Sequence, residues 1–423
     1  MKRTVVIGGG TSGIFAAIQI KELCPSMEVV LVERLERIGK KILATGNGRC
    51  NFSNSHVNST KYNNSSFVGP IIGKLSYSDL CNKLEEMGLM MTEDSEGRAY
   101  PYSESANSFL DILRINMKMQ GIIEKCNFEV KHILPLVVNK KSKYIVEDTR
   151  KQEIEADYVV IATGGKAYPI LGSNGSGYNL LKPWKVKITD TEPGLVGVKV
   201  DPQDVKGLSG IRVKAKVSLW EKKSKKLLWS ELGEVLFKED GLSGIVIMQL
   251  ASRISRYMVN KTVKSFFFDI DLLPQTSEND LLILLIKRQE LMKEIETGEF
   301  LNGIFAKNIG HLIMKRSKVD LSARVNDLTS KDLIRIVSII KRFSFEYKGL
   351  YGYDRAQVTV GGIDLNEISN KTLELYKVPN VFVCGEVMDI DGECGGYNMH
   401  FALASANVVA QSIQEKEGYN EQS

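Results

Sequence analysis

The sequence predicts an α/β fold built on a doubly wound parallel sheet. Three observations carry this prediction: a strand–glycine–helix–strand unit over residues 3–33, a second buried strand that ends in glycines at residues 158–165, and a third at residues 381–389. Short apolar strands of this kind, separated by helical stretches, are typical of a parallel sheet covered by helices on both faces.

The N-terminal unit begins with Val5–Ile7, a β-branched run typical of a buried parallel strand. Gly8, Gly10 and Gly13 follow with GxGxxG spacing and open an apolar helical stretch. Gly8 permits a tight turn, Gly10 lets the backbone approach a pyrophosphate, and Gly13 lets the helix pack closely on the strand. Three glycines alone are weak evidence, but strand, glycines and helix in this order predict a Rossmann-type dinucleotide-binding fold.

A second strand, residues 29–32, ends in Glu33, twenty residues after Gly13. An acid at this place can accept both ribose hydroxyls of an adenosine and would repel the extra phosphate of NADP. Thr11 and Ser12 begin the helix, whose N-terminal N–H groups and partial positive charge favour phosphate. The sequence therefore predicts that FAD or NAD binds here.

The composition is that of an ordinary soluble protein, with 423 residues, 43% apolar residues, 25% charged residues and a formal charge of +5. This length suggests two or three domains. No uncharged apolar run is long enough to predict a membrane span. The six cysteines are scattered without a CxxC pair, which indicates a reducing, cytoplasmic compartment. The four isolated histidines show no metal-ligand spacing, so we expect no metal site.

Glycines, amides and cations are concentrated in residues 38–51, directly after the second strand. In a doubly wound fold this segment lies at the carboxyl edge of the sheet, where ligands bind. Gly39–Asn51 resembles the signature of the BaiN-like family of NAD(P)/FAD-dependent oxidoreductases, also known as aminoacetone-oxidase-type FAD-binding enzymes. The resemblance implies FAD contacts from this segment and the preceding arginine, namely Arg34, Lys40, Lys41, Gly46, Asn47, Gly48, Arg49, Cys50 and Asn51.

Residues 158–165 resemble the second cofactor fingerprint of flavoproteins of the two-dinucleotide-binding type. The contacts expected from it come from Ala162, Thr163 and Gly164. In the same superfamily, a strand such as residues 127–132 carries a residue whose backbone touches the adenine, and Val130 is the candidate here.

The C-terminal part also resembles the family. Gly385-Glu386 follows a buried strand, and the resemblance places Glu386 on the ribityl chain of FAD. Residues 391–398 open a final helix, whose N-terminus we expect against the N1–C2=O edge of the flavin. The remaining implied contacts are Asp389, Gly395, Gly396, Tyr397 and Asn398. The chain departs from the family pattern at His400-Phe401, where Gln-Trp is expected.

The middle of the chain has a different sequence pattern. Short segments of alternating apolar and polar residues, typical of strands, are followed by two capped amphipathic helices, one of them expected over Ser277–Gly298. We therefore predict a discontinuous FAD-binding domain, residues 1–189 and 351–423, interrupted by a small β-barrel-like domain (190–268) and a helical subdomain (269–350). Residues 206–226 hold eight basic residues against one acid, Glu221. Because aromatic residues are sparse there, the pattern favours a solvated strand face over a nucleic-acid patch.

Since only one complete GxGxxG unit is present, we expect no second Rossmann domain that would hold NAD(P)H permanently. NAD(P)H is therefore expected to bind only transiently. The resemblance implies reduction of a small or steroid-like unsaturated ketone. Two alternatives remain: an FAD oxidase that passes electrons to oxygen, and an RNA-associated flavoprotein that uses the basic stretch. The candidates for the proton donor or other catalytic groups are Tyr397, Arg49, Tyr168 and Cys50, and for Cys50 a structural thiol is the favoured interpretation.

Overall fold

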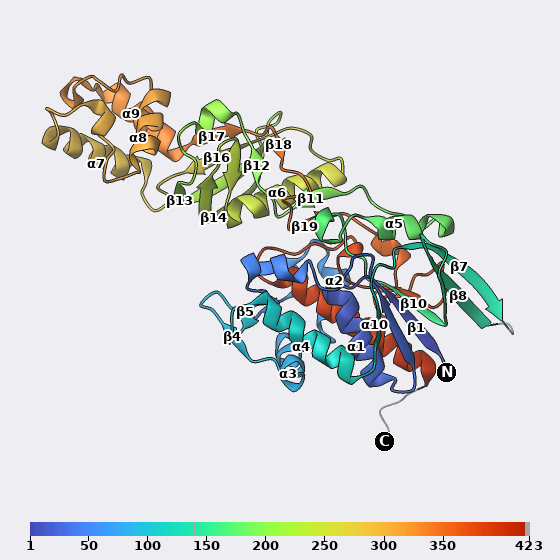
Figure 1. The fold of residues 1–423 in the computed structure, drawn as a ribbon. Helices are drawn as coiled ribbons and strands as arrows, with labels where there is room; N and C mark the ends of the chain where they lie inside the picture. The colour runs from blue at the N-terminus through green and yellow to red at the C-terminus, as the bar shows by residue number, and fades with distance from the viewer. Residues whose placement is uncertain (139–140, 419–423) are drawn as a thin grey trace. The chain divides into compact units, whose positions relative to one another are not determined.

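The computed structural model describes residues 1–138 and 141–418, which form two compact units (Figure 1). The first unit comprises Met1–Gly194 and Gly352–Ser423, and the inserted unit comprises Leu195–Tyr351. The first unit is thus built from both ends of the chain. Within the described residues, no helix is both long and apolar enough to cross a membrane.

A five-stranded parallel sheet forms the centre of the first unit, in the order β20-β10-β1-β2-β6. Its strands are β1 (Arg3–Ile7), β2 (Glu28–Val32), β6 (Ile123–Lys125), β10 (Tyr158–Ile161) and β20 (Val381–Val383). All four strand pairings are parallel, and β1 lies between β10 and β2. The predicted parallel α/β sheet is therefore confirmed, and the strands at residues 5–7, 29–32, 158–161 and 381–383 are present.

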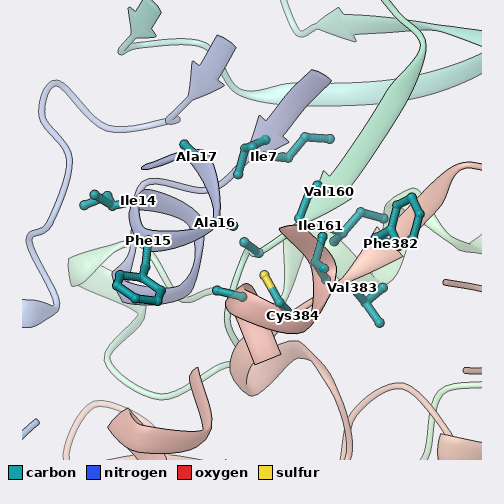
Figure 2. Close-up of a cluster of buried hydrophobic side chains, with 14 of the residues drawn as sticks. Ile7, Ile14, Phe15, Ala16, Ala17, Val160, Ile161, Phe382, Val383 and Cys384 are labelled. Carbon is teal, nitrogen blue, oxygen red and sulfur yellow. The ribbon is translucent and has the colours of Figure 1, made fainter. Parts of the chain in front are cut away.

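The hydrophobic core lies where helix α1 (Thr11–Leu23) meets β10 and β20. Figure 2 shows Ala16 on the side of α1 that faces Ile161 and Cys384, whereas the Phe15 ring points away from these strands. Every residue from position 12 to position 20 is buried, so α1 is covered on all sides. Helix α10 (Tyr397–Glu417) packs along α1 and also covers part of its surface (Figure 1). Burying each large apolar side chain contributes about 1.5–3 kcal/mol, so this contact contributes strongly to stability.

Shorter elements complete the first unit. The helices are α2 (Ser65–Ile72), α3 (Tyr77–Glu86), α4 (Ala106–Met119) and α5 (Ser176–Leu180). Small antiparallel sheets are formed by β3 (Ser53–Asn54), β4 (Met91–Glu93) and β5 (Arg98–Pro101), by β7 (Val130–Val138), β8 (Lys141–Asp148) and β9 (Glu153–Ala156), and by β11 (Glu192–Gly194) with β19 (Val358–Val360). The β11–β19 pair places the last residues before the insertion beside the first strand after it.

The inserted unit contains a seven-stranded antiparallel sheet in the order β17-β16-β13-β14-β15-β12-β18. The strands are β12 (Val198–Lys199), β13 (Arg212–Glu221), β14 (Leu227–Phe237), β15 (Gly241–Ser243), β16 (Phe266–Asp271), β17 (Phe343–Glu346) and β18 (Gly349–Leu350). The helices are α6 (Ile245–Val259), α7 (Glu278–Leu291), α8 (Lys307–Arg316) and α9 (Ser330–Lys341).

The inserted unit differs from its prediction in three respects. It is an open sheet rather than a barrel, because among the described strands β17 and β18 each have a single neighbour. Residues 343–350, which we assigned to a helical subdomain, form β17 and β18, and β16 spans the predicted boundary at residue 268. The first unit extends to Gly194, because β11 pairs with β19. Alternating apolar and polar residues indicate that a segment is a strand, but they do not show which distant strand it pairs with, and the pairing decides the sheet and its boundaries.

Helix α7 is also shorter than predicted. It begins after Ser277, whose hydroxyl accepts the Asp280 N–H, as the sequence indicates, but it ends at Leu291 rather than at Gly298. The Thr297 and Gly298 N–H groups donate instead to the carbonyls of Ala323 and Leu321, both at 2.9 Å. These tertiary hydrogen bonds hold residues 297 and 298 outside the helix.

Candidate functional site

The glycine loop between β1 and α1 is shaped by two close backbone contacts. A Cβ on Gly13 would lie 1.9 Å from the Gly8 carbonyl oxygen, and Gly8 itself has a φ of 111°. Gly10 is different, because a Cβ there would meet nothing within 4 Å and its φ of −87° suits any residue. Gly8 and Gly13 are therefore required by the fold, whereas the missing side chain of Gly10 leaves open space at the start of α1.

Glu33 lies beside this loop at the end of β2. Its carboxylate accepts the Gly9 N–H at 2.7 Å and the Leu35 N–H at 2.9 Å, which fixes its direction. The Phe128 N–H donates to the Glu33 carbonyl at 2.9 Å, so the start of β7, with Val130, is tied to the same place. Arg34 follows, with its Nε buried and without a described partner. This arrangement suits an adenosine whose ribose contacts Glu33.

Two contacts bring distant segments to the start of α1. A Cβ on Gly385 would lie 2.5 Å from the Ser12 hydroxyl, so the end of β20 touches the first turn of α1. The Thr11 hydroxyl lies 3.4 Å from the sulfur of Met399, in the first turn of α10. No described side chain caps α1 or α10. Two helix N-termini, neither of them capped by the side chain of its own N-cap residue, therefore lie close together at one edge of the sheet, which favours a ligand with negative charge.

An ion pair of two predicted cofactor residues lies at this edge. Lys41 donates to Glu386 at 2.7 Å, and the other carboxylate oxygen of Glu386 accepts the Thr359 N–H at 2.8 Å. The Thr359 hydroxyl in turn accepts the N–H groups of Lys166 and Ala167, at 2.7 and 3.1 Å. Glu386 is thus held between the signature segment, β19 and the loop after β10.

Two buried hydroxyls without a described partner lie at or beside α5, since Tyr178 belongs to this helix and Thr163 Oγ1 lies 1.9 Å from where a Cβ of Gly177 would stand. Thr163 Oγ1 and the Tyr178 hydroxyl are both buried and have no hydrogen-bond partner in the described structure. Tyr178 is only 7% exposed, and the negative charge of Glu386 acts on its hydroxyl. Burial and that charge raise the pKa of Tyr178, so it remains a donor at neutral pH. Leaving such a group unpaired costs about 1–3 kcal/mol, which a bound ligand with polar atoms can offset.

The residues present fit FAD on these observations. The open space at Gly10 and the uncapped start of α1 suit a pyrophosphate, and Glu33 suits a ribose. The unpartnered Thr163 and Tyr178 hydroxyls suit a polar chain that passes Glu386. Within the described residues, no group of three His, Cys, Asp or Glu side chains could hold a metal ion.

The start of α10 is anchored by amides from elsewhere in the chain. With the Asn51 amide oriented to suit its neighbours, its oxygen accepts the Gly396 N–H at 3.1 Å and its nitrogen donates to Ser53 at 2.8 Å. The Asn54 amide donates to the Gly395 carbonyl at 3.0 Å. A Cβ on Gly396 would lie 2.3 Å from the Ser53 carbonyl oxygen, so no other residue fits there without moving the backbone.

Tyr397 and Asn398 have distinct surroundings in the first turn of α10. The Tyr62 hydroxyl donates to the Tyr397 carbonyl at 2.8 Å, and the ammonium of Lys61 lies 5.7 Å from the Tyr397 ring centroid. Asn398 donates to Gly392 at 2.9 Å and accepts its N–H at 2.8 Å. In this structure Asn398 therefore stabilises the turn before the helix.

Several predicted cofactor residues make contacts that do not involve the Lys41–Glu386 ion pair or the starts of α1 and α10. Lys40 pairs with Glu36 at 2.5 Å, and Arg49 pairs with Glu104 at 3.4 Å while lying 4.7 Å from the Tyr100 ring centroid. Cys50 is fully buried, and burial raises its pKa to about 12, which fits a structural thiol. The remaining positions lie in left-handed or polar turns: Gly46, Asn47 and Gly48 in the signature loop, Gly164 and Tyr168 after β10, and Asp389 bonded to Thr189 at 3.1 Å.

The prediction missed four residues that organise the site. Thr359 and Ser405 hold the Glu386 loop, the latter by accepting the Gly385 N–H at 2.9 Å. Asn54 holds Gly395, and Tyr178 carries an unpaired hydroxyl beside Glu386. The only sequence signal for them was their position next to glycine-rich segments, because a hydroxyl or amide that bonds a distant backbone leaves no local pattern.

The glycine loop, the acid after β2 and the uncapped start of α1 define a Rossmann-type dinucleotide-binding domain. The chain belongs to the family described as HI0933-like protein Rossmann domain, whose model matches residues 2–412. The predicted resemblance to BaiN-like flavoproteins is confirmed by this match together with the relatives below.

Three relatives are similar to nearly the whole chain. A 3-dehydro-bile acid delta(4,6)-reductase of Clostridium scindens is 29% identical over 418 residues, which are 98% of this chain and 100% of the relative. A ribosomal RNA dihydrouridine synthase of Escherichia coli is 27% identical over 420 residues, 97% of each chain. The protein of the same name from Haemophilus influenzae is 27% identical over 418 residues, 97% of this chain and 98% of the relative.

The first prediction concerns Gly10. We expect Gly10→Val to fold normally, because a Cβ there meets nothing, but to lose bound FAD, because the added methyl groups occupy the pyrophosphate space. Thermal unfolding of the FAD-free protein and flavin absorbance after gel filtration measure the two effects. Gly69→Ala in α2, where a Cβ also has room, is the control and should retain FAD. A Gly10→Val protein that stays yellow would contradict the assignment.

The second prediction concerns Tyr178. Tyr178→Phe removes a hydroxyl that has no partner, so the FAD-free protein should be as stable as wild type or slightly more stable. FAD affinity should fall about five- to tenfold, since one hydrogen bond is worth about 1 kcal/mol. Tyr144→Phe is the matched control, because its hydroxyl donates to Pro379 at 2.5 Å: that variant should lose stability and keep its FAD affinity. Equal FAD affinity in Tyr178→Phe and wild type would exclude the contact.

The third prediction concerns His400, which is fully buried in α10 with Nδ1 2.8 Å from the Ser53 hydroxyl. Burial lowers its pKa to about 4 from 6.5, so between these values the unfolded chain binds a proton that the folded protein does not. Stability should therefore fall as the pH falls from 6.5 to 4, by roughly 3 kcal/mol from this residue. In urea unfolding, His400→Gln should flatten this dependence, and the exposed His56→Gln should not.

Proposed function

We propose that the chain binds FAD, accepts hydride from NAD(P)H and reduces a carbon–carbon double bond conjugated to a carbonyl group. The proposal that the chain binds FAD rests on one observation. The N-termini of α1 and α10, neither capped by its N-cap side chain, and the Lys41–Glu386 ion pair lie together at one edge of the sheet. Bound FAD supplies a two-electron carrier that separates the oxidation of a nicotinamide from the reduction of an acceptor.

The start of α10 is suited to stabilise negative charge on the N1–C2=O side of a reduced flavin. Gly395 and Gly396 present backbone without side chains, and Asn51 and Asn54 hold that backbone in place. Because these groups are already oriented, they stabilise charge without reorganisation. Losing one such donor typically costs about 3–4 kcal/mol of transition-state stabilisation.

An enone needs a proton after it accepts hydride, and Tyr397 is the best placed of the predicted donors. It stands in the first turn of α10, and burial raises its pKa, so it is protonated at neutral pH. The nearby Lys61 ammonium, above the ring, would stabilise a developing phenolate. Arg49 is engaged with Glu104 and Tyr100, which makes it a weaker candidate.

Two substrate classes share this chemistry. The Clostridium scindens relative is named as a reductase of a 3-dehydro-bile acid, which supports a small or steroid-like enone as the leading candidate. The other relatives are named as ribosomal RNA dihydrouridine synthases, and the C5=C6 bond of uracil is likewise conjugated to a carbonyl. A uridine in RNA is therefore the second candidate, which the exposed lysines around the β13–β14 turn favour. An oxidase that uses oxygen remains the alternative for the second half-reaction.

The fourth prediction separates the two half-reactions. We expect anaerobic NADH or NADPH to bleach the bound flavin, and an enone to restore its colour faster than dissolved oxygen does. Tyr397→Phe should leave bleaching within about threefold of wild type and slow reoxidation by the enone at least tenfold, because only the second step takes up a proton at carbon. Stopped-flow absorbance measures both rates.

Tyr376→Phe is the matched control, because this tyrosine is exposed at the surface, and it should leave both rates unchanged. Reoxidation by the enone at the wild-type rate in Tyr397→Phe would rule out this residue as the donor. Flavin that neither NADH nor NADPH bleaches, in a protein that retains FAD, would contradict the proposed electron donor. Faster reoxidation by oxygen than by any enone would favour the oxidase.

A further inference from the structure

A concentration of positive charge lies at the turn between β13 and β14 of the inserted unit. Residues 221–226 read Glu-Lys-Lys-Ser-Lys-Lys, and all four lysines are exposed or, for Lys222, half exposed. The turn is ordered, since the Glu221 N–H donates to the Lys226 carbonyl at 2.9 Å and the Lys225 N–H to the Glu221 carbonyl at 3.0 Å. The backbone positions that carry these four lysines are therefore fixed by a β-hairpin.

Two further lysines join this turn. The Lys222 N–H donates to the Ser265 carbonyl at 3.0 Å, which places the exposed Lys264 next to the turn. Glu346 on β17 pairs with both Lys222 and Lys348, the latter at 2.7 Å. We call this set the lysine tip: Lys222, Lys223, Lys225, Lys226, Lys264 and Lys348.

The lysine tip keeps an excess of positive charge over the carboxylates that are described around it. Glu221 and Glu346 lie among the six lysines, Glu221 accepts the Ser224 hydroxyl, and Asp201 and Asp204 act on Lys348, so six cations face four carboxylates. The ion pairs with Lys222 and Lys348 lower the pKa of Glu346 to about 2, so this carboxylate stays charged and is shared by two lysines. Like charges within about 10 Å repel one another at physiological salt, so this arrangement opposes folding slightly unless an anion binds.

An aromatic pair borders the lysine tip. Trp220, the last outward-facing residue of β13 before the turn, stacks on Phe267 of β16 with ring centroids 6.1 Å apart and planes 8° apart. Both side chains are partly buried, and each leaves only a minor part of its surface exposed. Cations beside a flat aromatic surface are the combination that single-stranded nucleic acids recognise, through phosphates and through base stacking. An anionic membrane surface would instead favour an extended apolar face, and among the described residues that directly flank the turn Leu227 is the one large exposed apolar side chain.

We propose that the lysine tip binds RNA through its phosphate groups, with the Trp220–Phe267 pair as an adjacent stacking surface. This proposal rests on the second candidate function, a uridine in RNA as the acceptor. It assigns RNA binding to a surface of the inserted unit, whereas the electron-transfer chemistry belongs to the first unit. The interaction does not depend on the base sequence, because phosphates carry none.

Fluorescence anisotropy with a labelled 20-nucleotide single-stranded RNA tests the proposal. The tip variant replaces Lys223, Lys225, Lys226 and Lys264 by Gln. The control variant makes the same change in net charge at four exposed lysines on α7, α8 and α9: Lys287, Lys307, Lys315 and Lys331. We expect RNA affinity to fall at least tenfold in the tip variant and less than threefold in the control. The salt dependence should also weaken, its logarithmic slope decreasing by roughly 3 for four lysines.

Equal losses in the two variants, or wild-type affinity in the tip variant, would overturn the proposal. So would wild-type protein that does not bind the RNA at 50 mM salt, or that binds vesicles containing phosphatidylserine through the tip and not RNA. Both variants should keep FAD and the wild-type rate of flavin bleaching by NAD(P)H, because the replaced lysines lie outside the first unit. RNA binding that depends on the tip, without dihydrouridine formation, would support the surface and remove RNA from the candidate substrates.

Discussion

The first unit depends on one close approach, between the start of α1 and the glycine loop after β1. The Gly8 carbonyl lies where a Cβ of Gly13 would stand, so the helix can begin directly on the sheet. This position lets α1 bury its whole circumference between the sheet and α10. Its N-terminal N–H groups then remain directed at the sheet edge, uncapped by side chains of the described chain. A methyl group at position 13 would separate the helix from the strand and remove both properties.

The site is assembled from segments that are far apart in the sequence, and most of them are joined by a contact between a side chain and a backbone group. Ser12 touches Gly385, Glu386 accepts the Thr359 N–H, and Asn51 bonds Gly396, while Lys41 and Glu386 form an ion pair between side chains. Hydrogen bonds to the backbone tolerate little displacement, because they weaken steeply with misalignment. The geometry around a ligand is thus set mainly by the fold, and the exposed side chains can vary around it.

The sequence was sufficient to predict the parallel sheet, α1, α10 and the position of the glycine loop, because each has a local signature in period or spacing. It was not sufficient for Tyr178 or Thr359, whose importance comes from hydroxyls that face residues far away in the chain. The same limit explains the inserted unit. The alternation of residues 343–346 is visible, yet only the tertiary structure shows that this strand pairs with β16. Thr297 and Gly298 are likewise held outside helix α7 by hydrogen bonds to residues 321–323.

The β11–β19 pair has a consequence for how this protein could diversify. Gly194, the last residue before the insertion, lies opposite Val358, so the insertion leaves and rejoins the first unit at neighbouring points of one small ladder. A segment whose ends are already held together can be lengthened, shortened or exchanged at little entropic cost. The first unit and the inserted unit can therefore evolve independently of each other, each keeping its own core while the other changes.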